Sequence, residues 1–169
     1  DLRTEGITVN LVVVGDGQML DQWQQDASAL GITNQVLFVG RVPWSEVPKY
    51  INSFDICFVG HKVTQANNAV NGKIYMSPLK MYEYLSMAKP VLASNFDDTR
   101  RVVKEGETGL FFEPEDIESL KHTIRYAYNN RETVDKLGLN GRREMIDKHS
   151  WVSRMEYLLE EMANRNLIR

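Results

Sequence analysis

The chain has 169 residues, of which 43% are hydrophobic and 25% charged, and its formal net charge at pH 7 is −3. This size and composition fit one folded domain and exclude a disordered chain. The absence of a long basic run disfavours nucleic-acid binding through a broad phosphate-contacting surface. The single cysteine, Cys57, excludes an intramolecular disulfide framework and suits a reducing compartment, so we expect a cytoplasmic protein. No apolar stretch approaches the roughly 20 residues that span a membrane.

Strand and helix signals alternate along the chain. Short runs rich in β-branched residues predict strands, and apolar residues at helical spacing predict the helices that separate them. The predicted strands cover residues 9–14, 36–39, 55–59, 90–93 and 109–112. The predicted helices cover residues 20–30, 45–51, 79–87, 97–104, 117–127 and 133–148, and a last one begins at residue 151. Residues 60–77 are polar and rich in Asn and Gly, which is typical of a long functional loop.

Several residues are expected to begin helices or to lie on their apolar faces. Polar side chains at Ser45, at Asp97 or Asp98, and at Asp116 are in position to act as N-caps. Ile117, Leu120, Ile124 and Ala127 share one helix face, and Met155, Leu158, Leu159 and Met162 share another. Gly138 and Gly141 are expected to loosen the helix over residues 133–148.

The alternation predicts an α/β fold, a Rossmann-like parallel sheet with helices on both faces. We expect this domain to span residues 1–150 and a projecting C-terminal helix to span residues 151–169. Ligands of such sheets bind beyond the carboxyl ends of the strands. The chain starts at Asp1 without an initiator Met, so we expect it to be cut from a longer protein.

A glycine turn follows the first predicted strand. Gly15 and Gly17 flank Asp16 between this strand and a helix, where backbone N–H groups can approach a phosphate. The full dinucleotide motif requires a third glycine, but Leu20 occupies that position. A tight turn without a ligand therefore stays an equal alternative.

The most informative segment covers residues 77–94. It follows the long loop and begins a helix, so the N–H groups of residues 79–81 (Leu79, Lys80 and Met81) are expected to face the crevice and to bind a diphosphate. Lys80 adds a positive charge, and Glu83 lies one turn further on, where its carboxylate can accept hydrogen bonds from a ribose diol. The alternative is an ordinary helix on which Lys80 and Glu83 form a solvated ion pair.

This segment resembles the donor-site motif of retaining GT-B glycosyltransferases, especially glycosyltransferase family 4. Relatives of the closest type contain stretches similar to SPxKxxEYLAxGKPV, and this chain reads SPLKMYEYLSMAKPV over residues 77–91. The resemblance continues in order through VGDG at 14–17, FVGRV at 38–42, EGETGLFFEPED at 105–116 and HSW at 149–151. The chain is thus similar to the C-terminal, donor-binding domain of that fold over nearly its whole length.

The resemblance implies roles for particular residues. Glu83 is expected to hold the donor ribose, the amides just before it the diphosphate, and Arg41 and Val42 the base. Many family members carry a second glutamate eight residues before the first, where this chain has Tyr75. The sugar contact is therefore expected from Ser77 or from the loop at residues 60–77.

A second departure from the family pattern concerns the start of the domain. Family members carry an Arg and a Lys, which neutralise the leaving diphosphate, after a first strand that would precede Asp1. We therefore expect this chain to lack that strand and to be inactive by itself, with Lys80 as its own catalytic cation.

The implied reaction is transfer of a sugar from a UDP- or GDP-linked donor to an acceptor hydroxyl with retained configuration. No metal and no cofactor are expected. The missing N-terminal domain is expected to bind the acceptor and to bring the enzyme to the inner face of a membrane. The sequence itself does not fix the base, the sugar or the acceptor.

Three alternatives remain open at the level of sequence. A GT-B-fold sugar-nucleotide epimerase needs acid and base groups in the crevice, and His61 is the one obvious candidate. A non-catalytic module that binds a nucleotide sugar or a protein partner needs none. An NADP-binding domain is supported by Arg41 alone.

Overall fold

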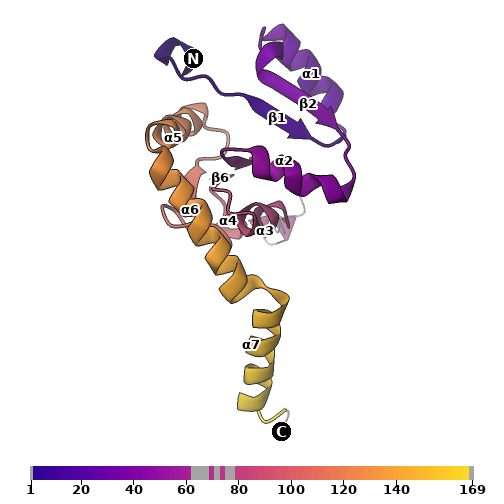
Figure 1. The fold of residues 1–169 in the computed structure, drawn as a ribbon, viewed down its shortest axis with the longest axis vertical. Coiled ribbons are helices and arrows are strands. Elements are labelled where there is room, and N and C mark those ends of the chain that lie inside the picture. Colours follow the sequence, from indigo (N-terminus) through magenta and orange to yellow (C-terminus); the bar gives the residue numbers. More distant parts are fainter. Residues whose placement is uncertain (1, 62–68, 71–72, 75–78, 168–169) are drawn as a thin grey trace. The chain divides into compact units, whose positions relative to one another are not determined.

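The computed structural model describes residues 2–61, 69–70, 73–74 and 79–167. The chain forms two compact units, Asp1–Ser53 and Phe54–Arg169 (Figure 1). Each unit contains a parallel sheet with helices, which confirms the predicted α/β, Rossmann-like class.

The first unit contains a two-stranded parallel sheet. β1 (Leu11–Val14) pairs with β2 (Val36–Gly40), and the register shifts between Val13 and Val14. The helices of this unit are α1 (Leu20–Ala29) and α2 (Val47–Ser53), and its 3-10 turns are η1 (Leu2–Glu5), η2 (Thr33–Gln35) and η3 (Trp44–Glu46). Gly31, with a φ of +65°, ends α1 in the left-handed conformation that glycine adopts without strain.

The second unit contains the three-stranded parallel sheet. Its strands lie in the order β3 (Cys57–Val59), β6 (Val91–Ser94) and β7 (Gly109–Phe112). The helices are α3 (Leu79–Ser86), α4 (Asp97–Arg100), α5 (Ile117–Asn129), α6 (Arg131–Glu144) and α7 (Trp151–Asn164), and a π-helical turn, η4 (Met145–His149), separates the last two. Two short antiparallel strands, β4 (Ala69–Val70) and β5 (Lys73–Ile74), lie within the predicted loop.

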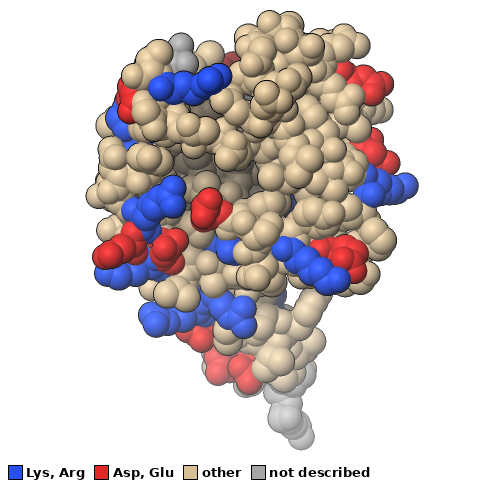
Figure 2. All heavy atoms as spheres, turned by 45° about the horizontal axis from the view of Figure 1, so that its top comes forward, with Lys and Arg blue, Asp and Glu red and all other residues tan. Residues whose placement is uncertain are grey.

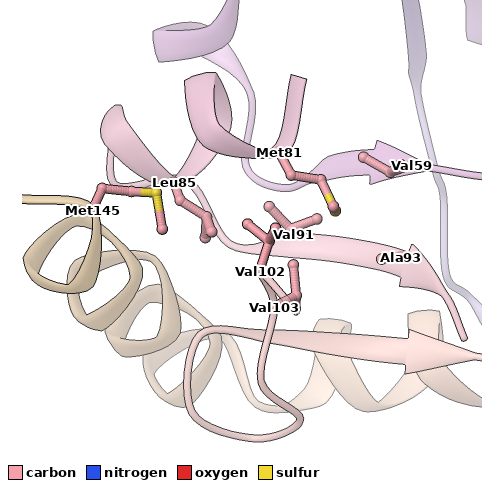
Figure 3. Close-up of a cluster of buried hydrophobic side chains, with 8 residues drawn as sticks. All are labelled: Val59, Met81, Leu85, Val91, Ala93, Val102, Val103 and Met145. Carbon is pink, nitrogen blue, oxygen red and sulfur yellow. The ribbon is translucent and has the colours of Figure 1, made fainter. Parts of the chain in front are cut away.

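The central strand β6 has apolar partners on both faces. Its four residues are all buried, and successive side chains of a strand point to opposite faces. On one face Val91 and Ala93 meet side chains of α3 and η4, as Figure 3 shows; this cluster is completed by Val59, Met81, Leu85, Val102, Val103 and Met145. On the other face Leu92 packs with Leu110, Phe112, Val134 and Leu137. Helices therefore cover both faces of the sheet in this unit, as predicted.

The two glycines of α6 do not loosen the helix, so that prediction is wrong. Gly138 and Gly141 are both buried within α6, which is unbroken from Arg131 to Glu144. A Cβ on Gly138 would lie 2.2 Å from the carbonyl oxygen of Ala88, and a Cβ on Gly141 would lie 2.5 Å from Cδ2 of Leu85. The missing side chains allow α6 to lie directly against α3 and the turn that follows it.

The predicted N-caps have different outcomes. Asp116 caps α5, because its carboxylate accepts the N–H of Ser119 at 2.9 Å. Ser45 does not cap a helix and lies inside the 3-10 turn Trp44–Glu46.

The start of α4 also differs from the prediction. Neither Asp97 nor Asp98 caps this helix, and both lie within it. The hydroxyl of Thr99 accepts the N–H of Phe96 at 3.0 Å instead.

One helix face differs from the predicted one. Leu120, Ile124 and Ala127 of α5 pack against the core, but Ile117, the first residue of this helix, is 69% exposed. The apolar residues of α7 are not buried in this chain, and Met155, Leu158 and Leu159 are exposed. Within the described residues, no helix has the length and apolar character needed to cross a bilayer.

Candidate functional site

Ser94 lies at the carboxyl end of the central strand of the second unit. The residue is fully buried, and its hydroxyl donates to the carbonyl of Val59 at 3.3 Å and accepts the N–H of His61 at 3.1 Å. The carbonyl of Ser94 accepts a hydrogen bond from the hydroxyl of Thr99 at 2.7 Å. One buried residue thus joins the ends of β3 and β6 through its hydroxyl and the start of α4 through its carbonyl, at the edge where open parallel sheets bind ligands.

A polar network that the sequence did not predict lies at the same edge. Asn95 follows β6 and donates from Nδ2 to Oε1 of Glu113, which follows β7, at 2.6 Å. Its amide oxygen accepts a hydrogen bond from Nε of Arg100 on α4. The only sequence signal for these residues was their position directly after predicted strands.

The N-terminal turn of α3 carries the residues predicted to bind the diphosphate. Leu79 is 69% exposed and Lys80 is also exposed, whereas the side chain of Met81 has no exposed area and belongs to the core. Met81 therefore has only its backbone N–H to offer to a ligand. The first N–H groups of a helix have no partner within it, and the helix dipole makes this end attractive to anions. Ser77 lies outside the described residues.

Glu83 lies one helical turn after Lys80 and is half-buried. Among the residues that the structure describes, no ion pair joins Lys80 to Glu83, in contrast to the Lys49–Glu46 and Lys121–Glu118 pairs at the same spacing. The predicted alternative, a solvated ion pair on an ordinary helix, is therefore not formed. Both charged groups remain available to a ligand.

His61 follows β3 and lies close to the start of α3. Burial lowers the pKa of its imidazole below 6.5, and the positive charge of Lys80 lowers this pKa further. His61 and Ser94, which are 33 residues apart in sequence, are thus joined at the carboxyl end of the sheet, and the charge of Lys80 acts on the His61 ring.

Two other titratable groups of the second unit, Cys57 and Tyr84, are unsuited to acid, base or nucleophilic chemistry. Burial raises the pKa of the Cys57 thiol to about 12, which the charge of Lys89 only partly opposes. Burial, with the negative charge of Glu83, raises the pKa of Tyr84 to about 12 as well. Both groups stay protonated near neutral pH, and a neutral thiol is a poor nucleophile.

The four candidate residues of the first unit lie at the carboxyl ends of its two strands. The N–H of Gly15 donates to the carbonyl of Gly40 at 2.8 Å, and the φ of Gly15 is +139°, which only glycine adopts easily. Gly17 lies in open space, where an added Cβ would meet no atom within 4 Å. Nε of Arg41 lies 3.8 Å from Oδ2 of Asp16, both side chains being exposed, and Val42 is half-buried. These residues form one surface around the glycine turn.

Two small hollows lie among the described residues of the second unit, away from the candidate residues of α3. One, of about 210 Å³, is lined by Tyr82, Ser86, Arg142, Met145, Ile146, His149 and Ser150. The other, of about 280 Å³, lies around Phe54, Lys89 and Leu139. Both are smaller than the roughly 300–1,000 Å³ of ordinary ligand pockets, and neither contains Lys80, Glu83 or His61.

Charge and metal-ligand chemistry give two further observations. Figure 2 shows a face on which basic and acidic side chains alternate, without a broad patch of one sign. In the part of the chain that the structure describes, no group of three His, Cys, Asp or Glu residues is arranged to hold a metal ion.

The family follows from a comparison with family models. Residues 1–144 match the model described as "Glycosyl transferases group 1". The chain belongs to this family. The match covers both sheets and every candidate residue named above, which agrees with the resemblance found in the sequence.

Curated relatives extend the comparison over the whole chain. One is the GDP-mannose-dependent alpha-(1-6)-phosphatidylinositol monomannoside mannosyltransferase of Mycolicibacterium smegmatis, 24% identical over 171 residues that cover 100% of this chain and 43% of the relative. Another is the sulfoquinovosyl transferase SQD2 of Arabidopsis thaliana, 26% identical over 69% of this chain and 25% of the relative. The chain thus spans less than half the length of these relatives.

Solved structures support the same fold. HepE of Anabaena in complex with UDP-glucose superposes with a TM-score of 0.68 at 19% identity, over 92% of this chain and 41% of that one. The C-terminal domain of the group 1 glycosyl transferase LpcC from Francisella tularensis superposes with a TM-score of 0.67 at 19% identity, over 84% of this chain and 70% of that one. At these identities the likeness establishes the GT-B-type, Rossmann-like fold.

Proposed function

We propose that this chain is the donor-binding module of a retaining glycosyltransferase. The enzyme would transfer a sugar from a nucleoside diphosphate sugar to an acceptor hydroxyl, without a metal or a cofactor. The bond between the anomeric carbon and the diphosphate breaks, the diphosphate leaves with the electron pair, and the acceptor oxygen bonds to the same face as it loses its proton. Retention is the outcome that the resemblance to family 4 implies.

The observation that carries this proposal is the arrangement at the start of α3. Lys80 and Glu83 lie one turn apart without pairing with each other, and Lys80 lies near His61 at the carboxyl end of β3. An unpaired cation at a helix N-terminus stabilises a departing diphosphate, because it neutralises charge that develops as the bond breaks. A half-buried carboxylate one turn away suits a ribose diol, which has two hydroxyl donors and no charge.

The remaining candidate residues receive roles consistent with this arrangement. We assign the diphosphate to the N–H groups of Leu79, Lys80 and Met81 with the side chain of Lys80, a phosphate contact to the glycine turn at Gly15 and Gly17, and a sugar contact to Ser77. Arg41 and Val42 would contact the base.

Binding measurements on a panel of nucleotides would identify the base of the donor. The relative from M. smegmatis is named for GDP-mannose and the Anabaena structure contains UDP-glucose, so both bases belong in the panel. We expect UDP or GDP to raise the thermal unfolding midpoint of the protein, and NADPH to leave it unchanged. Stabilisation by NADPH alone would favour the dinucleotide-binding alternative.

Substitution of Glu83 tests the site directly. We expect Glu83→Gln to weaken binding of the preferred nucleoside diphosphate by about 1.5–3 kcal/mol, the range for a hydrogen bond to a charged group. Isothermal titration calorimetry measures the change, and circular dichroism checks that the variant folds.

A matched control for this substitution is Glu156→Gln, on the exposed surface of α7. This variant removes the same charge and should bind like the original protein. Equal affinity of the original protein and the Glu83→Gln variant would remove Glu83 from the site.

Two further parts of the proposal, the acceptor and the location of the reaction, concern the whole enzyme. More than half of the M. smegmatis relative lies outside the part that this chain matches, and we propose that such a part binds the acceptor. That relative is named for a phosphatidylinositol mannoside, which favours a lipid-linked acceptor at the inner face of a membrane, reached from the cytoplasm. Product analysis separates transfer from epimerisation, since an epimerase changes the donor sugar without an acceptor.

A further inference from the structure

The backbone of His61 is anchored to a buried residue, and one of its two ring nitrogens is covered. Its backbone N–H is bonded to the hydroxyl of Ser94, which is itself fully buried and anchored to Val59. The imidazole is half-buried, and Nδ1 is the covered nitrogen, with no hydrogen-bond partner among the described residues. Nε2 is therefore the ring nitrogen left to meet a ligand.

The surroundings of His61 favour a neutral ring. Burial and the nearby charge of Lys80 both disfavour the imidazolium form, and no carboxylate acts on the ring among the described groups. A proton on Nδ1 would be a buried donor without an acceptor, which costs more than a buried nitrogen lone pair. The neutral tautomer with its proton on Nε2 avoids this cost, so the free edge of the ring is a hydrogen-bond donor.

We propose that His61 binds a diphosphate oxygen of the donor by donating a hydrogen bond from Nε2 as a neutral imidazole, next to Lys80. This inference rests on the proposed function and adds a ligand contact to it. Lys80, the residue assigned to the diphosphate, is the charged neighbour of the ring, which is why the contact is assigned to phosphate and not to the base. A neutral donor adds directional binding without adding a second charge beside Lys80.

Three substitutions separate this role from a structural one. The side-chain amide nitrogen of Gln reaches about as far as Nε2 of His, whereas that of Asn stops near the position of Nδ1. With UDP or GDP, whichever the original protein binds, we expect His61→Gln to keep affinity within about threefold. We expect His61→Asn and His61→Ala each to lose roughly tenfold or more, the range for a hydrogen bond to a charged group.

A comparison of the affinities for different nucleotides identifies the phosphate that His61 contacts. If the β-phosphate is contacted, the loss in His61→Ala should be equal for the nucleoside diphosphate and its sugar derivative, UDP-glucose or GDP-mannose, and should vanish for the monophosphate. A loss seen only with the sugar derivative would overturn the assignment to phosphate. A loss of equal size in His61→Gln and His61→Ala would overturn the Nε2 donor.

Nitrogen NMR of the histidine rings gives a readout that a purely structural role would not change. In the complex near pH 7 we expect the resonances of His61 to show a neutral ring with the proton on Nε2, and that proton to shift on addition of the diphosphate. An imidazolium signature, or no shift, would contradict the inference. Glu83→Gln is the separate check on the proposed function, so weak binding by that variant with unaffected His61 variants would remove His61 alone.

Discussion

Gly138 is the glycine of the second unit at which an added Cβ would lie closest to another atom. A Cβ at this position would lie 2.2 Å from the carbonyl oxygen of Ala88 and 2.9 Å from the nitrogen of Pro90. Both obstacles are backbone atoms of the connection between α3 and β6, which cannot turn aside as a side chain can. We expect Gly138→Ala to destabilise the protein by about 1–3 kcal/mol, although Ala is the better helix former, as measured by urea unfolding.

Gly141, one turn further along α6, provides the comparison. A Cβ there would meet only the side chain of Leu85, closest at Cδ2. Because that methyl group can move with a small change of rotamer, Gly141→Ala should cost less than Gly138→Ala. Equal stability of the two variants would contradict the close approach of the Ala88 backbone to Gly138.

Among individual residues, the sequence predicted those whose chemical type and spacing indicate a binding role. Lys80 and Glu83 were found because they lie one turn apart at a predicted helix start. Asn95 and Glu113 were missed, because their hydrogen bond depends on β6 and β7 being neighbours, and strand order is not contained in a hydrophobic pattern. The glycines of α6 were misjudged for the same reason, since the atoms that they avoid lie about 50 residues away in sequence.

The junction of α6 and η4 is held by charge. The carboxylate of Glu144 lies 2.7 Å from Nζ of Lys104, in the turn before β7, and 3.4 Å from Nζ of Lys148. Burial raises the pKa of Glu144, whose side chain is 14% exposed, but the hydrogen bond and charge of Lys104 and the charge of Lys148 outweigh burial and lower the pKa below 4.5. The carboxylate is therefore more acidic in the folded protein than in the unfolded chain.

This difference predicts an acid-dependent stability. A carboxyl group with a lowered pKa stabilises the fold fully above its unfolded pKa, near 4.5, and this contribution disappears as the pH falls through the folded value. We expect Glu144→Gln to lower stability at pH 7 by on the order of 1 kcal/mol and to flatten the loss of stability between about pH 5 and 3. Urea unfolding of both proteins between pH 3 and pH 7 measures this change in the free energy of unfolding.

A second glutamate gives the control for this experiment. Glu160 lies on the exposed surface of α7, and Glu160→Gln should leave the pH profile of the original protein unchanged. Identical profiles for Glu144→Gln and the original protein would show that the pair with Lys104 does not contribute to folding.

Element boundaries show what periodicity can and cannot specify. The apolar pattern predicted one helix over residues 133–148, and the structure has α6 followed by the π-helical turn η4. An apolar pattern with a period near 3.6 residues continues almost unchanged through one π-helical turn, so it does not reveal such a turn at the end of a helix. By contrast, β7 was predicted with its observed bounds, because Gly109 and Glu113 mark both ends of the apolar run.

The whole chain ends in a helix that contributes no buried residue. Trp151 is 88% exposed, and every other residue of α7 is exposed or half-buried. Residues that bury no area add little to the free energy of unfolding. We therefore expect removal of residues 151–169 to leave the urea unfolding midpoint nearly unchanged.

The same truncation has a distinct expected effect on association. Apolar side chains exposed along one helix favour contact with another surface, so the shortened protein should self-associate less in sedimentation velocity. A large loss of stability on truncation would show that α7 packs against the rest of the protein.

On the scale of the molecule, the class of fold was predictable. Alternating strand and helix signals suffice for a parallel α/β architecture, and the structure and the family confirm it. The domain predicted over residues 1–150 and the C-terminal helix predicted over residues 151–169 stay predictions, and the structure describes two compact units with separate parallel sheets. Local patterns do not specify which strands share a sheet, because pairing joins residues that are distant in sequence.

The arrangement of α3 has a consequence for how such modules change over generations. Its buried positions, Met81 and Leu85, are four residues apart on one side of the helix, and Lys80 and Glu83 lie outside that pair. Substitutions at Lys80 and Glu83, the positions that we assign to the donor, therefore leave the core of the sheet intact. A lineage can therefore change these two side chains without repacking the core, so its fold and its contacts with a ligand can stay under separate selection.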